Sequence, residues 1–257
     1  QALMDKQPEY KRSLEKLPPK LREAWLNGSW DIYEGQFFEE FRDDPRHYKD
    51  RTYTHVIDAF EVPEGWTVYR SFDWGYNKPF SCGWWAVDYD GVLYRMLELY
   101  GCTDTPNEGF KWPPEQVFAE IHRIEVEHRW LAGKKIIGIA DPAIWDAERG
   151  ESIADVAAKH RGYFSPGDNK RIPGWMQVHY RLHFDENGFP QMYIFKNCGA
   201  FIRTIPMLMY DDHRVEDLDT SMEDHVADEV RYMCMARPIK PIVPEVDDGY
   251  THSAVYQ

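Results

Sequence analysis

Three aspartates occupy positions in the sequence from which an active site could be assembled. Asp73 ends a strand-like run, Asp141 follows a short apolar run, and Asp228 belongs to a helical pattern near the end of the chain. Ligand-binding side chains gather where neighbouring strands end, so acids that are distant along the chain can meet at that edge of a sheet. Asp224 lies four residues before Asp228, which places both on one face of the expected helix, and His225 follows Asp224 directly.

A cluster of carboxylates needs a partner of opposite charge, because each buried acid resists ionisation near another. Mg²⁺ and Mn²⁺ are hard cations that favour carboxylate oxygens. Two such ions about 3.5–4 Å apart can activate a water and stabilise the departing oxygen of a phosphodiester. The acids therefore predict hydrolysis of a phosphodiester with bound divalent cations.

Each acid also has an ordinary structural interpretation. An Asp before Gly or Pro is commonly a turn residue or a helix cap, which applies to Asp73 and Asp141. Asp224 could favour the N-terminus of a helix through the helix dipole. Asp228 could pair with Arg231 three residues later. These alternatives stay open at the level of the sequence.

Other acids and histidines fit a catalytic role less well. Glu98 on the expected third strand is interpreted as an ordinary solvent-facing acid rather than a residue supporting a metal. His122 and His128 lie six residues apart, off a common helical face, and no HExxH motif includes them, so we expect them and Glu125 to be surface residues. The four cysteines form no CxxC pair and are expected to be reduced thiols.

The charge balance limits how the chain can hold nucleic acid. Lys and Arg number 30 against 44 Asp and Glu, a formal net charge of −14, so long-range attraction to phosphate should be weak or confined to a local patch. Bound cations would then supply the positive charge at the reacting phosphate. Lys78, Lys170 and Arg171 are the candidate DNA contacts. No stretch approaches the roughly 18–20 apolar residues of a membrane span.

The elements that would position the acids form a mixed α/β pattern. An antiparallel meander of three strands is expected first, with an Asp-Gly turn between the second and third. Helices and further strands follow it, so a strictly alternating parallel fold is excluded. The expected strands span residues 67–73, 80–87, 92–100, 135–140 and 191–195. The expected helices begin near residue 114 and span residues 152–160, 199–209 and 222–235, and a polar loop spans residues 165–174.

Residues 1–60 are polar and aromatic without strand alternation, and we interpret them as a linker or arm preceding a main domain at residues 61–257. Trp30, Phe37, Phe38 and Phe41 would dock this arm on the domain.

Several short segments, in order, resemble the nuclease domain of large terminase subunits of tailed phages or prophages. Arg-Ser-Phe-Asp-Trp-Gly-Tyr-Asn-Lys-Pro at residues 70–79 resembles its opening strand, and Ile-Ala-Asp-Pro-Ala at 139–143 its second acidic strand end. Gly-Asp-Asn-Lys-Arg-Ile-Pro-Gly at 167–174 is similar to its polar loop, and residues 223–232 to its terminal acidic helix. Residues 17–31 are similar to the segment that joins the packaging ATPase to the nuclease.

The resemblance implies an RNase H-like fold and a DNA endonuclease that uses two Mg²⁺ or Mn²⁺ ions to cut concatemeric viral DNA. Asp73, Asp141 and Asp228 would be catalytic metal ligands, and relatives vary over whether residues such as Asp224 and His225 bind metal. The implied partners are double-stranded DNA, the packaging ATPase of the same polypeptide, the small terminase subunit and the portal, in the host cell cytoplasm. The sequence contains no GxxxxGK[ST] phosphate loop, so ATP hydrolysis is not expected.

Two other functions remain open. A junction resolvase or transposase of the same fold would prefer branched DNA or transposon ends. A non-catalytic portal-docking module would carry its acids for solubility alone. Stabilisation by Mn²⁺ would separate a carboxylate metal site from such a module.

Overall fold

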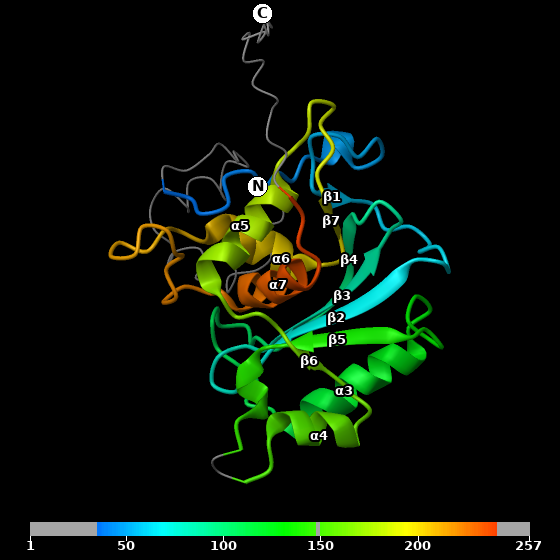
Figure 1. Cartoon of the computed structure of the whole chain (residues 1–257), viewed down its shortest axis with the longest axis vertical. Coiled ribbons are helices and arrows are strands. Elements are labelled where there is room, and N and C mark those ends of the chain that lie inside the picture. The colour runs from blue at the N-terminus through cyan, green and yellow to red at the C-terminus, as the bar shows by residue number, and fades with distance from the viewer. Residues whose placement is uncertain (1–34, 148–149, 241–257) are drawn as a thin grey trace, which may run out of the picture.

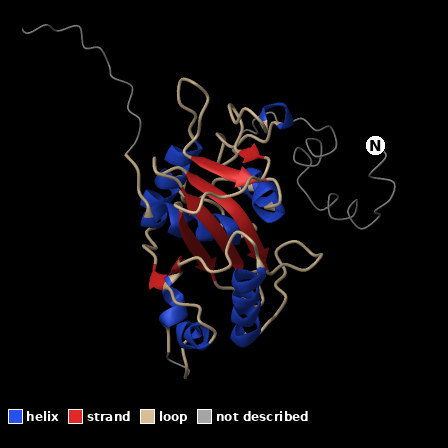
Figure 2. Cartoon of the chain, turned by 90° about the vertical axis from the view of Figure 1, so that its right-hand side faces the viewer, coloured by secondary structure: helices blue, strands red, loops and turns tan. Residues whose placement is uncertain are grey.

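A computed structural model of the chain describes residues 35–147 and 150–240. Its centre is a seven-stranded sheet in the order β1-β7-β4-β3-β2-β5-β6, with helices on both faces (Figures 1 and 2). β2, β3 and β4 pair antiparallel, and the remaining neighbours pair parallel. The predicted mixed sheet, a meander followed by parallel strands, is confirmed.

The meander consists of β2 (Thr67–Asp73), β3 (Ser81–Val87) and β4 (Leu93–Tyr100). The turn between β3 and β4 is built by Asp88, whose carboxylate accepts hydrogen bonds from the backbone N–H groups of Asp90 (3.0 Å) and Val92 (2.9 Å). Gly91 takes a φ of 85°, which disfavours other residues. Each predicted meander strand therefore lies within one residue of its position in the structure.

The parallel strands extend the meander on both sides. β5 (Ile136–Ala140) pairs with β2, and the two-residue β6 (Ser165–Pro166) follows at that edge. On the other side β7 (Met192–Phe195) pairs with β4, and β1 (Val56–Ile57) pairs with β7. This arrangement places the carboxyl ends of β2 and β5 next to each other.

Five helices in the described ranges cover the sheet. Figure 1 shows α3 (Pro114–Glu127) and α4 (Ile153–Lys159) on one side of it, and α5 (Arg171–Leu182), α6 (Gly199–Thr204) and α7 (His225–Ala236) on the other. α7 packs across β2, β3 and β5, and α5 packs on α7. None of the described helices is long and apolar enough to cross a lipid bilayer.

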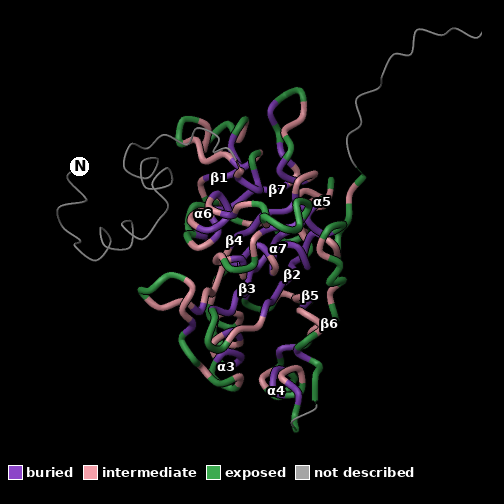
Figure 3. The backbone as a smooth tube through the Cα atoms, turned by 90° about the vertical axis from the view of Figure 1, so that its left-hand side faces the viewer, coloured by how far each residue is buried: buried purple, intermediate pink, exposed green. Residues whose placement is uncertain are grey.

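The central strands form the core, as Figure 3 shows by their burial. β3 is buried throughout, and its two adjacent tryptophans point to opposite faces. Trp84 donates from Nε1 to Glu125 on α3, and Trp85 donates from Nε1 to Ser71 on the α7 side.

The part of the predicted arm that the structure describes is packed against this core. Phe37, Phe38 and Phe41 are buried, as expected of docking residues, and β1 joins the sheet. Trp30 lies outside the described residues. The domain boundary near residue 60 stays a prediction.

The structure corrects three element boundaries. The loop predicted at 165–174 gives way to α5 at Arg171, since Pro173 lies in the first turn, where its missing N–H leaves no intrahelical bond unmade. The helix predicted at 199–209 ends at Thr204 and continues as the 3-10 turn η4 (Ile205–Met207), which contains Pro206. The last helix begins at His225 rather than Met222, and Asp224 is its N-cap residue.

Candidate active site

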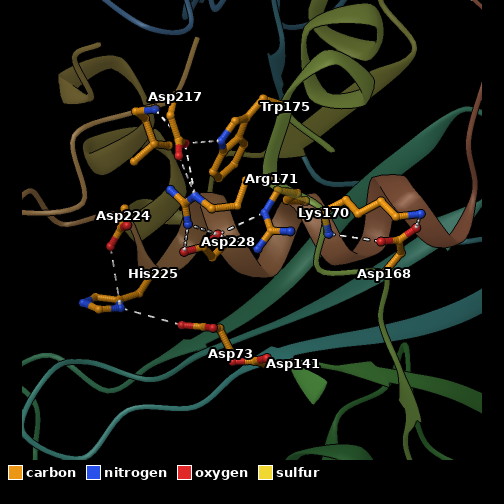
Figure 4. A network of polar contacts seen from close by, with 12 residues as sticks. Asp73, Asp141, Asp168, Lys170, Arg171, Trp175, Asp217, Asp224, His225 and Asp228 are labelled. Atoms are coloured by element: carbon orange, nitrogen blue, oxygen red, sulfur yellow. Dashed lines mark hydrogen bonds and ion pairs between the residues drawn. The ribbon is translucent and has the colours of Figure 1, made fainter. Parts of the chain in front are cut away.

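The first two acids lie side by side at the carboxyl ends of neighbouring parallel strands. Phe72 pairs with Ala140, so Asp73, the last residue of β2, lies next to Asp141, the first residue after β5. The backbone N–H of Asp141 donates to the carbonyl of Phe72 at 3.0 Å, and Figure 4 shows the two carboxylates next to each other. Asp141 also caps the 3-10 turn η3 (Pro142–Trp145) by accepting from the N–H of Ala143 at 3.0 Å. Asp141 is therefore both the N-cap residue of η3 and a member of the acid cluster.

Asp73 is a buried carboxylate with no cationic side chain of the described residues in direct contact except a histidine. It is 8% exposed, and its polar side-chain contact within the described ranges is a 3.6 Å approach of His225 Nδ1. Burial, together with the negative charges of Asp228 and Asp141, raises the pKa of Asp73 well above its usual range. Three acids from distant parts of the sequence thus act on one another electrostatically.

The start of α7 supplies Asp224 and His225. Burial and the nearby charge of Asp228 raise the pKa of Asp224 to about 7. Burial lowers the pKa of His225, and its Nε2 lies 3.1 Å from the Asn107 side-chain oxygen. The imidazole thus keeps Nδ1 on the side of Asp73, with Asp224 3.9 Å away (Figure 4).

Asp228 differs from the other acids because two guanidinium groups contact it. Arg231 donates from Nη2 at 2.8 Å and from Nε at 3.0 Å, so the pair suggested by the sequence is present. Arg171 Nη1 lies 3.3 Å from the same carboxylate, while its Nε contacts Asp217 at 3.0 and 3.1 Å. Arg171, a predicted DNA contact, is thus engaged with two acids of its own chain.

The two predicted lysine contacts are exposed. Lys170 precedes α5, and its Nζ lies 3.6 Å from Asp168, away from the acid cluster in Figure 4. Lys78 lies in the loop after β2, close enough that its charge contributes to the lowered pKa of His225. The role of Lys78, Lys170 and Arg171 in binding DNA stays a prediction.

Glu229, next to Asp228, is a fully buried acid that the sequence analysis missed. It accepts from Arg95 Nη1 at 2.6 Å, from Trp85 Nε1 and Ser81 Oγ at 3.2 Å, and from the Ser71 hydroxyl. These hydrogen bonds link α7 to β2, β3 and β4 next to the acid cluster.

Sequence signals for this network exist in hindsight. Glu229 lies three residues after Val226 and four before Met233, on the apolar face of α7, where an acid requires a buried partner. Gly83 leaves the space, since a Cβ there would collide with Arg95 and Glu229. Asp217, in a polar loop, has no comparable signal.

Two expectations about other acids are wrong. Glu98 does not face solvent: its side chain is 9% exposed and accepts from the backbone N–H groups of Ala200 (2.5 Å) and Phe201 (3.2 Å) in the first turn of α6. Glu125 is not a plain surface residue, since it accepts from the buried Arg70 at 2.6 Å and from Trp84. A helix start and a buried cation supply these partners, and both are tertiary features.

The donor atoms suit a hard divalent cation better than any other ligand, because they are carboxylate oxygens with one imidazole nitrogen. Within residues 35–147 and 150–240, however, no three His, Cys, Asp or Glu side chains are arranged as a ready metal-binding group. Arg171 and Arg231 contact the Asp228 carboxylate. No described guanidinium or lysine contacts Asp73 or Asp141, so these two carboxylates are the ones open to a cation.

No family model and no curated protein matches the chain. Among solved structures, the large terminase of a thermophilic bacteriophage, in complex with ADP, is similar, with 19% identity and a TM-score of 0.56 over 91% of this chain and 52% of that one. The P22 large terminase nuclease domain is similar with 17% identity and a TM-score of 0.54 over 80% of this chain and 94% of that domain.

The chain therefore spans about half the length of the thermophilic phage terminase and nearly all of the P22 nuclease domain. At these identities the likeness establishes the fold: the chain has the RNase H-like fold of the nuclease domain of phage large terminases. The resemblance inferred from the sequence motifs is confirmed at this level.

Proposed function

We propose that this chain is a divalent-metal-dependent endodeoxyribonuclease, the nuclease part of a viral large terminase that cuts concatemeric genome DNA during packaging. The observation that carries the proposal is the buried Asp73. It lies beside Asp141 at the strand ends and near Asp228, and no described guanidinium or lysine contacts it, whereas structural acids are usually paired. Such a cluster suits a cation from outside the chain.

In this proposal Asp73, Asp141 and Asp228 would hold two Mg²⁺ or Mn²⁺ ions. The ions supply positive charge that activates a water and offsets the charge on the departing 3′-oxygen. His225 and Asp224 assist at the Asp228 side. The lowered pKa of His225 keeps its imidazole neutral, the form in which a ring nitrogen can bind a cation.

The chain itself should hold DNA weakly. Its formal net charge is −14, and Lys78, Lys170 and Arg171 are few contacts for a duplex, so binding should be poor at about 0.15 M salt. We propose that the packaging ATPase of the same polypeptide, with the small terminase subunit and the portal, presents the DNA in the host cell cytoplasm. A tight, salt-resistant complex formed without metal would contradict this.

Plasmid cleavage with Mn²⁺ or Mg²⁺ tests the proposal. Asp73→Ala and Asp141→Ala should each lose on the order of 10²–10³-fold or more of the activity, since the reacting charge is no longer stabilised. Asp104→Ala makes the same change at an exposed acid outside the cluster and should cut normally, and circular dichroism verifies that all variants fold.

Retained cleavage in both site variants, with no effect of EDTA, would overturn the mechanism. At 100 times its dissociation constant, Mn²⁺ should also stabilise the parent chain by about 2.7 kcal/mol, which raises its melting temperature. Asp73→Ala should show no such rise. A docking module would show neither effect. Preference for branched over linear DNA would favour a junction resolvase.

A further inference from the structure

The two sides of the acid cluster differ in what neutralises them. Asp73 and Asp141 face each other without a described guanidinium or lysine, whereas the Asp228 carboxylate is contacted by Arg171 and Arg231 (Figure 4). A carboxylate that already holds cationic groups offers less to an incoming metal ion, because the ion must replace those contacts.

Arg231 is the fixed member of the pair. Its side chain is 2% exposed and lies on the same helix as Asp228, three residues further on. The aliphatic stem packs against Gly174 of α5, where a Cβ would collide with it, so Gly174 allows α5 to approach α7 this closely. Arg231 therefore belongs to the packing between the two helices.

Arg171 is held differently. Its side chain is 27% exposed, and its closer contacts are the 3.0 and 3.1 Å bonds from Nε to Asp217. The bonds from Nη1 to Asp228 are longer, at 3.3 and 3.4 Å, and Nη2 is buried without a hydrogen-bond partner among the described residues. Arg171 is anchored at one acid and rests more loosely on the other.

Asp217, which binds Nε of Arg171, is itself held by other hydrogen bonds. Asp217 is buried and also accepts from Trp175 Nε1 at 2.7 Å and from the backbone N–H of Leu218 at 2.9 Å. These bonds do not depend on Asp228. Arg171 can therefore leave the Asp228 carboxylate and still stay beside the site through Asp217.

We infer that Arg171 is an internal competitor for the cation at Asp228. The inference rests on the proposed function and adds an order to it: without DNA, a divalent ion binds first at Asp73 and Asp141, and the second ion binds weakly because it must displace the guanidinium of Arg171. Once displaced, that guanidinium remains anchored to Asp217 with its Nη groups free for another anion, such as a DNA phosphate.

Calorimetric titration of the whole chain with Mn²⁺ in the absence of DNA tests this. Arg171→Gln should bind the second ion about tenfold more tightly than the parent chain, as expected for losing a charge-assisted contact. Lys170→Gln removes the same charge one residue earlier, where Nζ contacts Asp168, and should leave both affinities unchanged. Adding Asp228→Asn to Arg171→Gln should abolish the gain.

Arg171→Lys provides a second test should the glutamine variant fail to fold. Lysine keeps the charge but lacks the fork that reaches both acids, so the second ion should again bind more tightly, by a smaller factor. An unchanged second affinity in the Arg171 variants, or an equal gain in Lys170→Gln, would overturn the inference. If neither the parent chain nor any of the variants binds Mn²⁺, the proposed function is overturned instead.

Discussion

Glu229 and Asp73 are both buried carboxylates on the face of the sheet that α7 covers, and their surroundings are opposite. Glu229 is fully buried, and an arginine, a tryptophan and two serines donate to it. Asp73 has the charges of Asp141 and Asp228 nearby and a histidine at 3.6 Å. Among the residues that the structure describes, the Glu229 site is complete, with a guanidinium and three further donors, whereas the Asp73 site is incomplete, with no guanidinium or lysine in contact.

The difference is the one expected between a structural acid and the metal-binding acid that we propose. Removing one partner of a buried ion pair is costly, because the charge that remains is unpaired, so the Arg95–Glu229 pair belongs to the framework. A group of like charges with perturbed pKa values is the arrangement found where a ligand or cation is expected. Burial alone does not distinguish these two kinds of acid, but the side chains that contact each acid do.

The largest effect should come from removing Arg95, the cationic partner of Glu229. Arg95→Met leaves Glu229 charged and unpaired in the core, and we expect a loss of about 3–5 kcal/mol in the free energy of unfolding, measured by urea denaturation. Adding Glu229→Gln removes the orphaned charge and keeps an acceptor for the serines and the tryptophan. The double variant should therefore recover a large part of the loss.

A loss below about 1 kcal/mol in Arg95→Met, or no recovery in the double variant, would mean that the pair is not the framework of α7. Glu229 would then not be a structural acid, and its contrast with Asp73 would not hold.

An intermediate effect should appear in the pH dependence of the metal-free chain. The pKa of Asp224 is raised to about 7 in the folded state, so the contribution of Asp224 is fully present below about pH 4. It is lost as the pH rises towards about 7, at a rate of at most about 1.4 kcal/mol per pH unit for one proton.

Asp224→Asn should remove this loss, so the difference in unfolding free energy between variant and parent should grow between pH 4 and pH 7 in EDTA and then level off. If the unfolding free energies of Asp224→Asn and the parent change equally with pH, the burial of Asp224 costs no stability as the pH rises.

The same contrast explains what the sequence could and could not predict. The meander follows from local patterns, and the meeting of Asp73 and Asp141 follows from two strands that each end in an acid. α5 was missed because Pro173 and Gly174 are typical of loops, although Trp175, Val178 and Leu182 form a buried helical face.

The partners of the acids could not be predicted. Arg95 and Glu229 are 134 residues apart, and Arg171 and Asp217 are 46 apart, so no local pattern couples them. Their pairing depends on how α5 and α7 pack on each other and on the sheet. The residues of the incomplete site, by contrast, each stand at the end of an element or in its first turn, where sequence patterns are informative.

The smallest effect should come from neutralising the incomplete site. Because the pKa of Asp73 is raised in the folded state, the metal-free chain loses stability as the pH rises above about 4, where an unfolded aspartate ionises. Asp73→Asn has no such group, so the variant should be more stable than the parent by about 1 kcal/mol at pH 5. The gain should be larger at pH 7, because Asp73 ionises in the unfolded parent while burial and the neighbouring acids oppose its ionisation in the folded parent. Urea denaturation in EDTA at pH 5 and pH 7 measures it. Asp88→Asn, at an acid already satisfied by turn N–H groups, should show no such gain. Destabilisation by Asp73→Asn at both pH values would mean that Asp73, like Glu229, is a structural acid.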